Sequence, residues 1–445
     1  MPSVLLLIAD DWSRIAGCYG DPVVRTPHID AVAARGTVFD LAFCGSPSCA
    51  VSRATILTGL HSHTHGQYGH CHGIHGFRTR EDVQSLPRVL GPRGVHSACI
   101  GKKHVEPSSV YPFDVSDQEP LTSPGAQARA VSRFLGETRG APFYLHVAPA
   151  YPHRMSAGFG LDAHREEFPD TRYDPDTVPV PLFLPDHPDV RKDLAEYYGA
   201  VSRYDHCVGQ VLEALEASGR ADETLVIILT DHGMPFPGAK ASSFDSGHHC
   251  PLIVARPEQA KRGTRSQALV SWVDIFPTVL EWCGIEKSAW PGELQGRSLV
   301  PILEQEHPEG WDETYFSHCF HEVTNYFPYR VLRGRRYKYV RNLAYELSQP
   351  FPTDLFRSLS WAAVRREGIE NLGRRSRQNV VHRAREELFD LEADPAESVN
   401  RVEDPGLANV LAAMRAKLMD FRIRTKDPWL EVSFQEGEPG APGWG

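Results

Sequence analysis

The chain has 445 residues, with 47 Lys plus Arg against 57 Asp plus Glu, and a formal net charge of −10. Its hydrophobic fraction of 41% and charged fraction of 23% exclude a disordered, collagen-like or coiled-coil chain. An acidic chain lacks the broad basic face that nucleic acids and anionic membrane surfaces attract, so we expect neither partner. Any anionic ligand must therefore meet a local group of basic side chains.

The first residues predict a strand rather than a targeting segment. The apolar run from Val4 to Ala9 is short, ends at two aspartates and has no small-residue cleavage site after it. No apolar stretch approaches the roughly 18 residues of a membrane span. The nine cysteines form no C-x-x-C pair, which argues against a disulfide framework. We therefore expect a cytoplasmic protein; an exported form whose leader has been removed is the alternative.

Short apolar runs alternate with helical patterns along the first two thirds of the chain. Nearly continuous apolar strands separated by helices are typical of an α/β sheet that is covered on both faces. In such sheets ligands collect at the carboxyl ends of the strands. The predicted strands are residues 3–9, 95–101, 143–148 and 224–230, and the clearest helical patterns are residues 28–36 and 193–219.

Polar side chains follow each of these four predicted strands. Asp10 and Asp11 follow the first, the segment 102–104 follows the second, His153 follows the third and Asp231 follows the fourth. We expect these groups to meet at one edge of the sheet. Clustered carboxylates bind hard divalent cations, so the aspartates predict a metal site, with helix capping or turn formation as the alternative.

From about residue 311 the sequence changes to an alternating pattern rich in Arg and Tyr. The alternating segment YRVLRGRRYKYVRN predicts an antiparallel hairpin with Gly334 near its turn. The final residues are rich in Gly and Pro, which predicts a loose tail. We therefore divide the chain into a catalytic domain (residues 1–310), an α+β subdomain that completes the substrate pocket (residues 311–432) and a tail (residues 433–445).

Four motifs carry a family resemblance. The segment SPSCAVSRATILTG, with Cys49 and Arg53, resembles the signature of the sulfatase family, in which the cysteine is oxidised to formylglycine. GKKH (residues 101–104), DHG (231–233) and ELFDLEADPAESVN (387–400) match further family motifs in the same order. Convergence of four motifs identifies the chain as a member of this family. Val51 stands where the family usually has Pro or Ala, which bears on recognition by the maturation enzyme.

This resemblance implies an α/β fold like that of alkaline phosphatase, with a mixed sheet between helices and a smaller C-terminal α+β domain carrying an antiparallel sheet. Within the family, GKKHVEPSSVYPFD and HEVTNYFPYR resemble most the sulfamidase (N-sulfoglucosamine sulfohydrolase) branch. The implied activity is removal of the N-sulfate from terminal N-sulfoglucosamine of heparan- or heparin-type oligosaccharides, through a covalent formylglycine–sulfate intermediate.

Three alternatives stay open at this point. The first is hydrolysis of a sugar O-sulfate or an aryl sulfate ester. The second is hydrolysis of a phosphonate or phosphodiester, as in other members of the same superfamily. The third is a sulfatase-like binding protein without catalysis, which requires that Cys49 stays an unmodified, buried thiol.

The resemblance also implies a metal site and partners. Asp10, Asp11, Asp231 and His232, with formylglycine from Cys49, would hold Ca²⁺. Because an imidazole nitrogen is a softer ligand than an oxygen, His232 makes Mn²⁺ or another divalent ion an alternative. The implied partners are a sulfated saccharide and the enzyme that generates formylglycine. Self-association as a homodimer is a further alternative that the sequence leaves open.

Five side chains receive catalytic roles by the same resemblance. Arg53, Lys102 and Lys240 would surround the sulfate with positive charge, which a charged leaving group requires. His104 would deprotonate the second hydroxyl of hydrated formylglycine. His153 would donate a proton to the departing nitrogen, because an amine is too basic to leave as an anion. A structural role beside a proline turn is the alternative for His153.

The remaining candidates are residues expected to contact the sugar. Six histidines crowd the segment from His61 to His75, and we expect His63 and His75 to belong to a pocket wall. A second metal site is the weaker alternative, because alternating histidines on a loop lack the spacing of known zinc sites. His321, Glu322 and Arg330 would reach over the pocket rim from the second domain, unless they lie on a solvent-exposed strand edge.

Overall fold

The computed structural model describes residues 1–119, 121–155, 158–159, 164–292 and 294–430. The predicted tail, residues 433–445, lies outside these ranges. In the described part of the chain, no helix has the length and apolar character needed to cross a bilayer.

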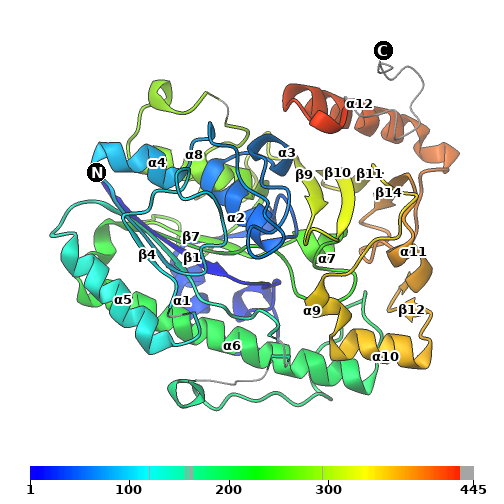
Figure 1. The fold of residues 1–445 in the computed structure, drawn as a ribbon, viewed down its shortest axis with the longest axis horizontal. Coiled ribbons are helices and arrows are strands. Elements are labelled where there is room, and N and C mark those ends of the chain that lie inside the picture. Colours follow the sequence, from blue (N-terminus) through cyan, green and yellow to red (C-terminus); the bar gives the residue numbers. More distant parts are fainter. Residues whose placement is uncertain (120, 156–157, 160–163, 293, 431–445) are drawn as a thin grey trace.

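An eight-stranded sheet forms the centre of the larger part of the molecule (Figure 1). Its strand order is β4-β3-β5-β1-β6-β7-β2-β8. Only β7 runs antiparallel to its neighbours, so the sheet is mixed. The strands are β1 (Ser3–Ala9), β2 (Thr37–Phe43), β3 (His96–Gly101), β4 (Val115–Asp117), β5 (Phe143–Ala148), β6 (Thr224–Thr230), β7 (Leu252–Ala255) and β8 (Thr264–Ser271).

Helices cover both faces of this sheet. Successive apolar side chains of the central strand β1 point to opposite faces, so each face needs a layer of helices to bury them. Leu5 and Leu7 of β1 pack with α1 (Pro27–Arg35), α5 (Pro124–Glu137) and α6 (Pro188–Ala217). Leu6 and Ile8 pack with α2 (Cys49–Thr58), α4 (Leu86–Leu90) and α8 (Ile275–Trp282). The predicted α/β sheet covered on both faces is confirmed.

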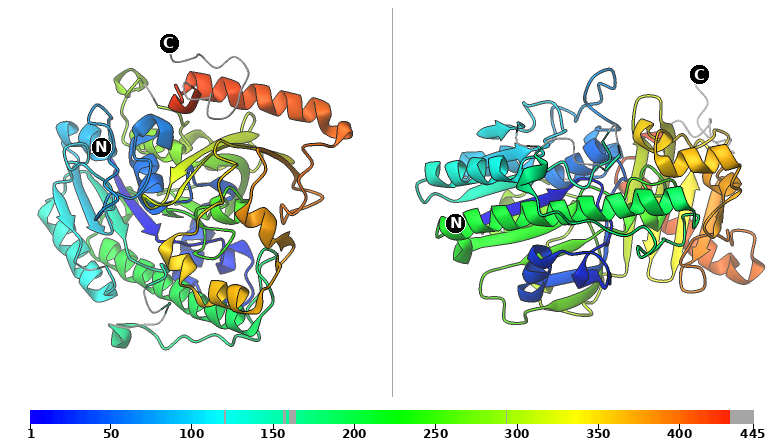
Figure 2. Two further views of the ribbon diagram at one scale, coloured as in Figure 1. Left: turned by 45° about the vertical axis from the view of Figure 1, so that its right-hand side comes forward. Right: turned by 90° about the horizontal axis from the view of Figure 1, so that it is seen from below.

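A second sheet lies beside the carboxyl ends of the central strands (Figure 2). It is antiparallel, with the order β14-β11-β10-β9. The predicted hairpin is confirmed: β10 and β11 pair up to Arg333 and Lys338, on either side of the turn after Gly334. The strands are β9 (Glu313–Phe320), β10 (Tyr326–Gly334), β11 (Tyr337–Asn342) and β14 (Glu386–Asp390).

Both faces of the second sheet are also covered. The helix α12 (Ala408–Arg424) packs Leu411 and Leu418 onto one face. The other face shares a core with Phe43 and Leu269 of the large sheet, so the two sheets are packed together. The remaining short elements are α3 (Ser62–His65), α7 (Asp245–His248), α9 (Thr353–Phe356), α10 (Leu359–Glu367), β12 (Asn371–Leu372), β13 (Arg375–Ser376) and α11 (Arg377–Val381).

Candidate active site

The carboxyl ends of the central strands bring acidic side chains together, as predicted from the strand pattern. Asp10 and Asp11 follow β1, and Asp231 and His232 follow the neighbouring parallel strand β6. The backbone N–H of Asp11 donates to Asp231 Oδ1 at 3.0 Å, which ties the two strand ends together. Asp11 has a φ of 69°, a left-handed conformation that costs a non-glycine residue on the order of 1 kcal/mol or more.

Cys49 is the first residue of α2 and lies against these carboxylates. Its Sγ is 3.2 Å from His232 Nε2 and 3.8 Å from Asp11 Oδ1. Burial by itself would raise the pKa of the Cys49 thiol, but Lys102, Lys240 and His232 hold it well below its usual value. The helix N-terminus adds to this positive potential. Position 49 is therefore a place where the protein stabilises negative charge.

Basic side chains neutralise the carboxylates. Arg53, one turn after Cys49 on α2, donates to Asp231 Oδ2 from Nε at 3.1 Å and from Nη2 at 2.9 Å. It also reaches Asp10 Oδ1 at 3.3 Å. Lys102 Nζ lies 2.8 and 2.7 Å from the two oxygens of Asp10. Arg53 is fully buried and is not among the described residues that line the pocket, so it contacts the carboxylates and not the pocket in which the sequence predicted it to surround the sulfate.

Lys240 connects the two parts of the molecule. Its Nζ donates at 2.9 Å to Asp11 Oδ2 and at 2.9 Å to Asp354 Oδ2, which comes from α9. Burial would lower the pKa of Lys240, but Asp11 and Asp354 raise it well above its usual value. Asp354 was not predicted as a site residue. It lies in the segment QPFPTDLF, for which the sequence alone suggested no role.

The side chains present fit a divalent cation. Asp10, Asp11, Cys49 and His153 offer ligand atoms within 4.8 Å of one another, as do Cys49, Asp231 and His232. We call Asp10, Asp11, Asp231 and His232 the carboxylate site. Carboxylate oxygens suit Ca²⁺, and the added imidazole nitrogen also suits Mn²⁺.

The orientation of His232 supports this fit. Its Nδ1 lies 3.0 Å from the carbonyl oxygen of Gly233, which can only accept, so Nδ1 carries the proton. Its Nε2 faces Cys49 and lies 3.0 Å from Asp11 Oδ1, so Nε2 is the atom that would bind a cation in exchange for its proton. Burial lowers the pKa of His232, but Asp231, Cys49 and Asp11 raise it to about 10. The surrounding negative charge therefore calls for a cation at this position.

The pKa values of two pocket histidines are shifted in opposite directions. Burial holds the pKa of His104 well below its usual value, so this imidazole is neutral. Burial would also lower the pKa of His153, but Asp11 and Asp10 raise it above its usual value. Its Nε2 lies 3.8 Å from Asp11 Oδ2. Two groups whose pKa values are pushed apart are suited to accept and to donate a proton.

A pocket of about 930 Å³ opens over this arrangement. Residues from both parts of the chain line it, so the structure brings together side chains that are far apart in the sequence. Those predicted from the sequence are Cys49, Lys102, His104, His153, Lys240, His321 and Glu322. The sequence reasoning missed further lining residues, among them His70, His72, Lys103, Lys192, Asp354 and Arg357.

Two predicted sugar-binding residues do not reach this pocket, and we correct that prediction. His63 is buried, with its ring nitrogens 2.7 Å from Ser317 Oγ and 2.7 Å from Thr425 Oγ1. Arg330 is buried and makes two parallel bonds to Asp427, of 2.9 and 2.8 Å. Both side chains are held by partners inside the chain, so neither is available to a ligand. His75 lies beside the pocket without lining it.

Comparison with known families agrees with this site. The sulfatase family profile matches residues 2–285. A profile described as N-sulphoglucosamine sulphohydrolase, C-terminal, matches residues 239–349. The chain belongs to the sulfatase family of hydrolases.

Individual relatives extend the likeness over the whole chain. Human N-sulphoglucosamine sulphohydrolase is 36% identical over 459 aligned residues, which cover 96% of this chain and 91% of the human protein. The phosphonate monoester hydrolase of Agrobacterium radiobacter has a TM-score of 0.72 at 20% identity, with 96% of each chain covered. A solved structure of a protein in complex with its substrate D-glucosamine-2-N,6-O-disulfate has a TM-score of 0.68 at 20% identity, with 96% of this chain and 98% of that chain covered. The predicted alkaline-phosphatase-like fold is confirmed.

Proposed function

We propose that this chain removes the N-sulfate from terminal N-sulfoglucosamine of heparan- or heparin-type oligosaccharides. The observation that carries the proposal is the position of Cys49. This residue begins α2, lines the pocket and lies against His232 and Asp11, in a field that strongly favours negative charge. The 36% identity to human N-sulphoglucosamine sulphohydrolase and the matching C-terminal profile support an N-sulfate as substrate.

Two groups would complete the site. Oxidation of Cys49 to formylglycine would supply a hydrated aldehyde, whose hydroxyl is a nucleophile that a thiol cannot replace. A divalent cation in the carboxylate site would supply a Lewis acid that polarises a sulfuryl oxygen.

The basic residues of the pocket bind the charged group of the substrate. A sulfamate carries negative charge that repels an incoming nucleophile. Lys102 and Lys240 both line the pocket, and each is already bonded to an aspartate of the carboxylate site. Their ammonium groups lie where the sulfamate must enter, and they stabilise it in a largely buried environment. Arg53, which is not among the described residues that line the pocket, donates hydrogen bonds to Asp10 and Asp231 and holds them in position.

The two pocket histidines divide the proton transfers. The amine that leaves a sulfamate needs a proton, and we assign its donation to His153, which lines the pocket and whose pKa Asp11 and Asp10 raise against the effect of burial. The neutral His104 accepts the proton of the hydroxyl that remains on residue 49. His321 and Glu322 line the part of the pocket built by the second sheet, and we assign them to the sugar.

The alternatives share much of this chemistry. A sulfate ester would use the same cations and the same proton donor, so the pocket charges by themselves favour neither substrate. The likeness to a phosphonate monoester hydrolase is one of fold at 20% identity. The profile of the C-terminal region and the human relative favour the N-sulfate.

The test is a set of paired assays on protein that is co-produced with a formylglycine-generating enzyme. We expect release of inorganic sulfate from N-sulfoglucosamine with a kcat/KM at least about tenfold above that for an aryl sulfate or a phosphonate monoester, the difference made by about 1.4 kcal/mol. An oligosaccharide whose terminal residue carries no N-sulfate should release none. Preference for the ester or the phosphonate would reject the proposal.

A further inference from the structure

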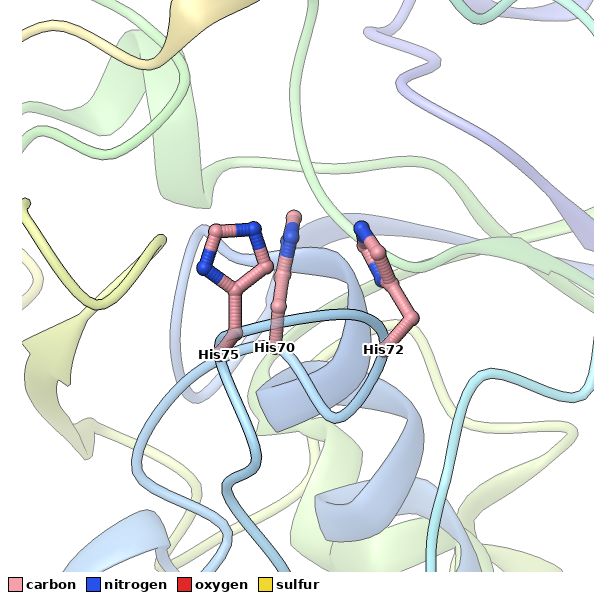
Figure 3. A group of neighbouring side chains, drawn as sticks. All are labelled: His70, His72 and His75. Atoms are coloured by element: carbon pink, nitrogen blue, oxygen red, sulfur yellow. The ribbon is translucent and has the colours of Figure 1, made fainter.

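Three histidines of the segment after α3 meet at the pocket rim. His70, His72 and His75 each offer a ring nitrogen within 4.8 Å of the other two. Figure 3 shows their three rings side by side on the same side of the loop. His70 and His72 line the pocket. We call these three residues the histidine site.

The backbone of the loop explains why irregular spacing in the sequence becomes proximity in space. The N–H of His75 donates to the carbonyl of His72 at 3.2 Å, and the N–H of Phe77 donates to the carbonyl of His70 at 3.1 Å. These bonds turn the chain back on itself. The N–H of His70 also donates to the carbonyl of His321 at 2.9 Å, which anchors the loop to the second sheet.

Some buried ring nitrogens in and beside the histidine site lack a partner in the described part of the protein. His70 is only 7% exposed, yet its Nε2 makes no hydrogen bond of ordinary length and angle in the described part of the chain. The same holds there for Nδ1 of His104 and Nδ1 of His321. The rings of these two residues lie 4.7 and 4.1 Å from the ring of His70. A buried polar atom without a partner is costly, so such a group of rings calls for a ligand.

We propose that the histidine site binds a divalent cation of the zinc class, distinct from the ion of the carboxylate site. Imidazole nitrogens suit Zn²⁺, Cu²⁺ or Ni²⁺, whereas Ca²⁺ and Mg²⁺ prefer oxygen. Three protein ligands leave one position of a tetrahedral ion open for water or for an anionic oxygen. The two sites therefore select different ions by the chemistry of their ligand atoms.

The hydrogen bonds of the ligands are compatible with this role. His72 Nδ1 lies 2.8 Å from His104 Nε2, and a proton on Nδ1 leaves Nε2 of His72 for the metal. His75 Nδ1 accepts a 3.2 Å bond from the N–H of Val323, a residue that is 39% exposed. Ligation through Nε2 of His75 places the ring proton on Nδ1, so this partly exposed hydrogen bond is exchanged for a metal bond.

The first test measures binding of the metal itself. The full chain is saturated with Ca²⁺ and dialysed against micromolar Zn²⁺, and bound zinc is counted by elemental analysis. We expect one zinc per chain that excess Ca²⁺ does not displace. The variants His72→Ala and His75→Ala should each weaken zinc binding about 10- to 100-fold, while His96→Ala, an exposed histidine at the start of β3, should not.

Two results would overturn the proposal. Displacement of the zinc by Ca²⁺ would assign it to the carboxylate site. Unchanged zinc binding in both His72→Ala and His75→Ala would remove the histidines as ligands. Since His72 is exposed and His75 is partly exposed, we expect both variants to fold, and circular dichroism checks this. Visible absorption of the Co²⁺-substituted protein provides a second readout, which should show a four-coordinate site in the wild type and lose it in the variants.

The histidine site also predicts an effect on hydrolysis, and this step rests on the proposed function. His72 is hydrogen-bonded to His104, the residue that we assign to accept the proton from residue 49. An ion bound to His72 therefore restricts the movement of the His104 imidazole. Zinc should therefore inhibit sulfate release, and the inhibition constant should rise about 10- to 100-fold in His75→Ala. Zinc bound without inhibition would leave the site in place and remove this role of His104. Absence of any sulfate release would reject the proposed function and leave the binding test intact.

Discussion

Two of the buried groups of charged side chains in the described part of this protein behave differently. The first is the carboxylate site with the cations that contact it. The second, which we call the Arg330 cluster, consists of Arg330, Arg422 and Asp427. In the Arg330 cluster a single carboxylate accepts from two guanidinium groups, at 2.8 to 2.9 Å, and no member lines the large pocket. The carboxylate site instead crowds three acidic side chains beneath a pocket of about 930 Å³.

The pKa values express the same contrast. Burial and the nearby Asp10 raise the pKa of Asp231 to about 6, although Arg53 opposes them. Burial would also raise the pKa of Asp427, but Arg330 holds it well below its usual value. The carboxylates of the carboxylate site differ from one another: the pKa of Asp231 is raised, whereas Lys102, His153 and Arg53 overcome burial and hold the pKa of Asp10 well below its usual value. Buried charge by itself does not mark a functional site; crowded like charges beside a cavity do.

The largest effect that this contrast predicts is loss of the nucleophile. Cys49→Ala should lower kcat by about 10⁴-fold or more, because residues that act as one catalytic unit fail together. The matched control is Cys99→Ala, which removes another fully buried thiol, in β3, and should keep activity. Sulfate release is the assay. If the activity of Cys49→Ala stayed within tenfold of the wild type, Cys49 would not supply the nucleophile.

Removal of the metal comes next. Chelation should lower activity by at least about 10³-fold and also lower the melting temperature, since a ligand at 100 times its Kd contributes about 2.7 kcal/mol to stability. Without the ion, only the basic side chains of the protein, Arg53, Lys102 and Lys240, balance the charge of the three aspartates. Added Ca²⁺ or Mn²⁺ should restore both properties. If chelation leaves both unchanged, the carboxylate site holds no ion that matters.

Lys240 tests the positive charge of the pocket. Lys240→Ala should lower kcat/KM by about 10²- to 10³-fold, the usual loss for one group that stabilises transition-state charge. Lys240→Arg keeps the charge and should retain activity within about tenfold. Equal losses in the two variants would indicate a packing role for Lys240.

Arg330 tests the second group of charges. Arg330→Ala leaves Asp427 buried with one guanidinium fewer and should destabilise the fold by about 3 to 5 kcal/mol. The kcat/KM of the folded protein should change by no more than about threefold. Denaturant unfolding and steady-state kinetics separate the two effects. A large loss of kcat/KM at unchanged stability would return Arg330 to the sugar-binding role that the sequence suggested.

The smallest effect is a pH dependence of stability. The pKa of Asp427 is lower in the folded protein than in the unfolded chain, whose value is about 3.9. The carboxylate therefore stabilises the fold above about pH 4, and this contribution is lost as the pH falls toward the folded value. Asp427→Asn should flatten the dependence of unfolding free energy on pH below about pH 4. A slope equal to that of the wild type would contradict this assignment.

The sequence predicted much of the fold and of the carboxylate site, because both depend on local patterns. The apolar run of β1 ends directly at Asp10 and Asp11, and β6 ends at Asp231, so strand topology alone places these groups together. The partners of His63 and Arg330 could not be predicted from the sequence in this way. Thr425 and Asp427 lie about a hundred or more residues away, and nothing near His63 or Arg330 in the sequence announces them.

The histidine-rich loop shows a third case. Its composition was visible, but its geometry depends on the turn bonds between His70 and Phe77, which residue spacing does not reveal. Asp354 was missed for a related reason. It reaches Lys240 only because α9, from the C-terminal part of the chain, packs over the pocket.

Whether formylglycine at position 49 carries the activity can be measured by mass spectrometry of the peptide that contains Cys49. In protein produced with a maturation enzyme, this peptide should carry an aldehyde. The aldehyde is recognised because the peptide has a lower mass than its thiol form and reacts with a hydrazide. We predict that the aldehyde fraction of each preparation is proportional to its sulfate release. A preparation that carries only the intact thiol and still releases sulfate would contradict it.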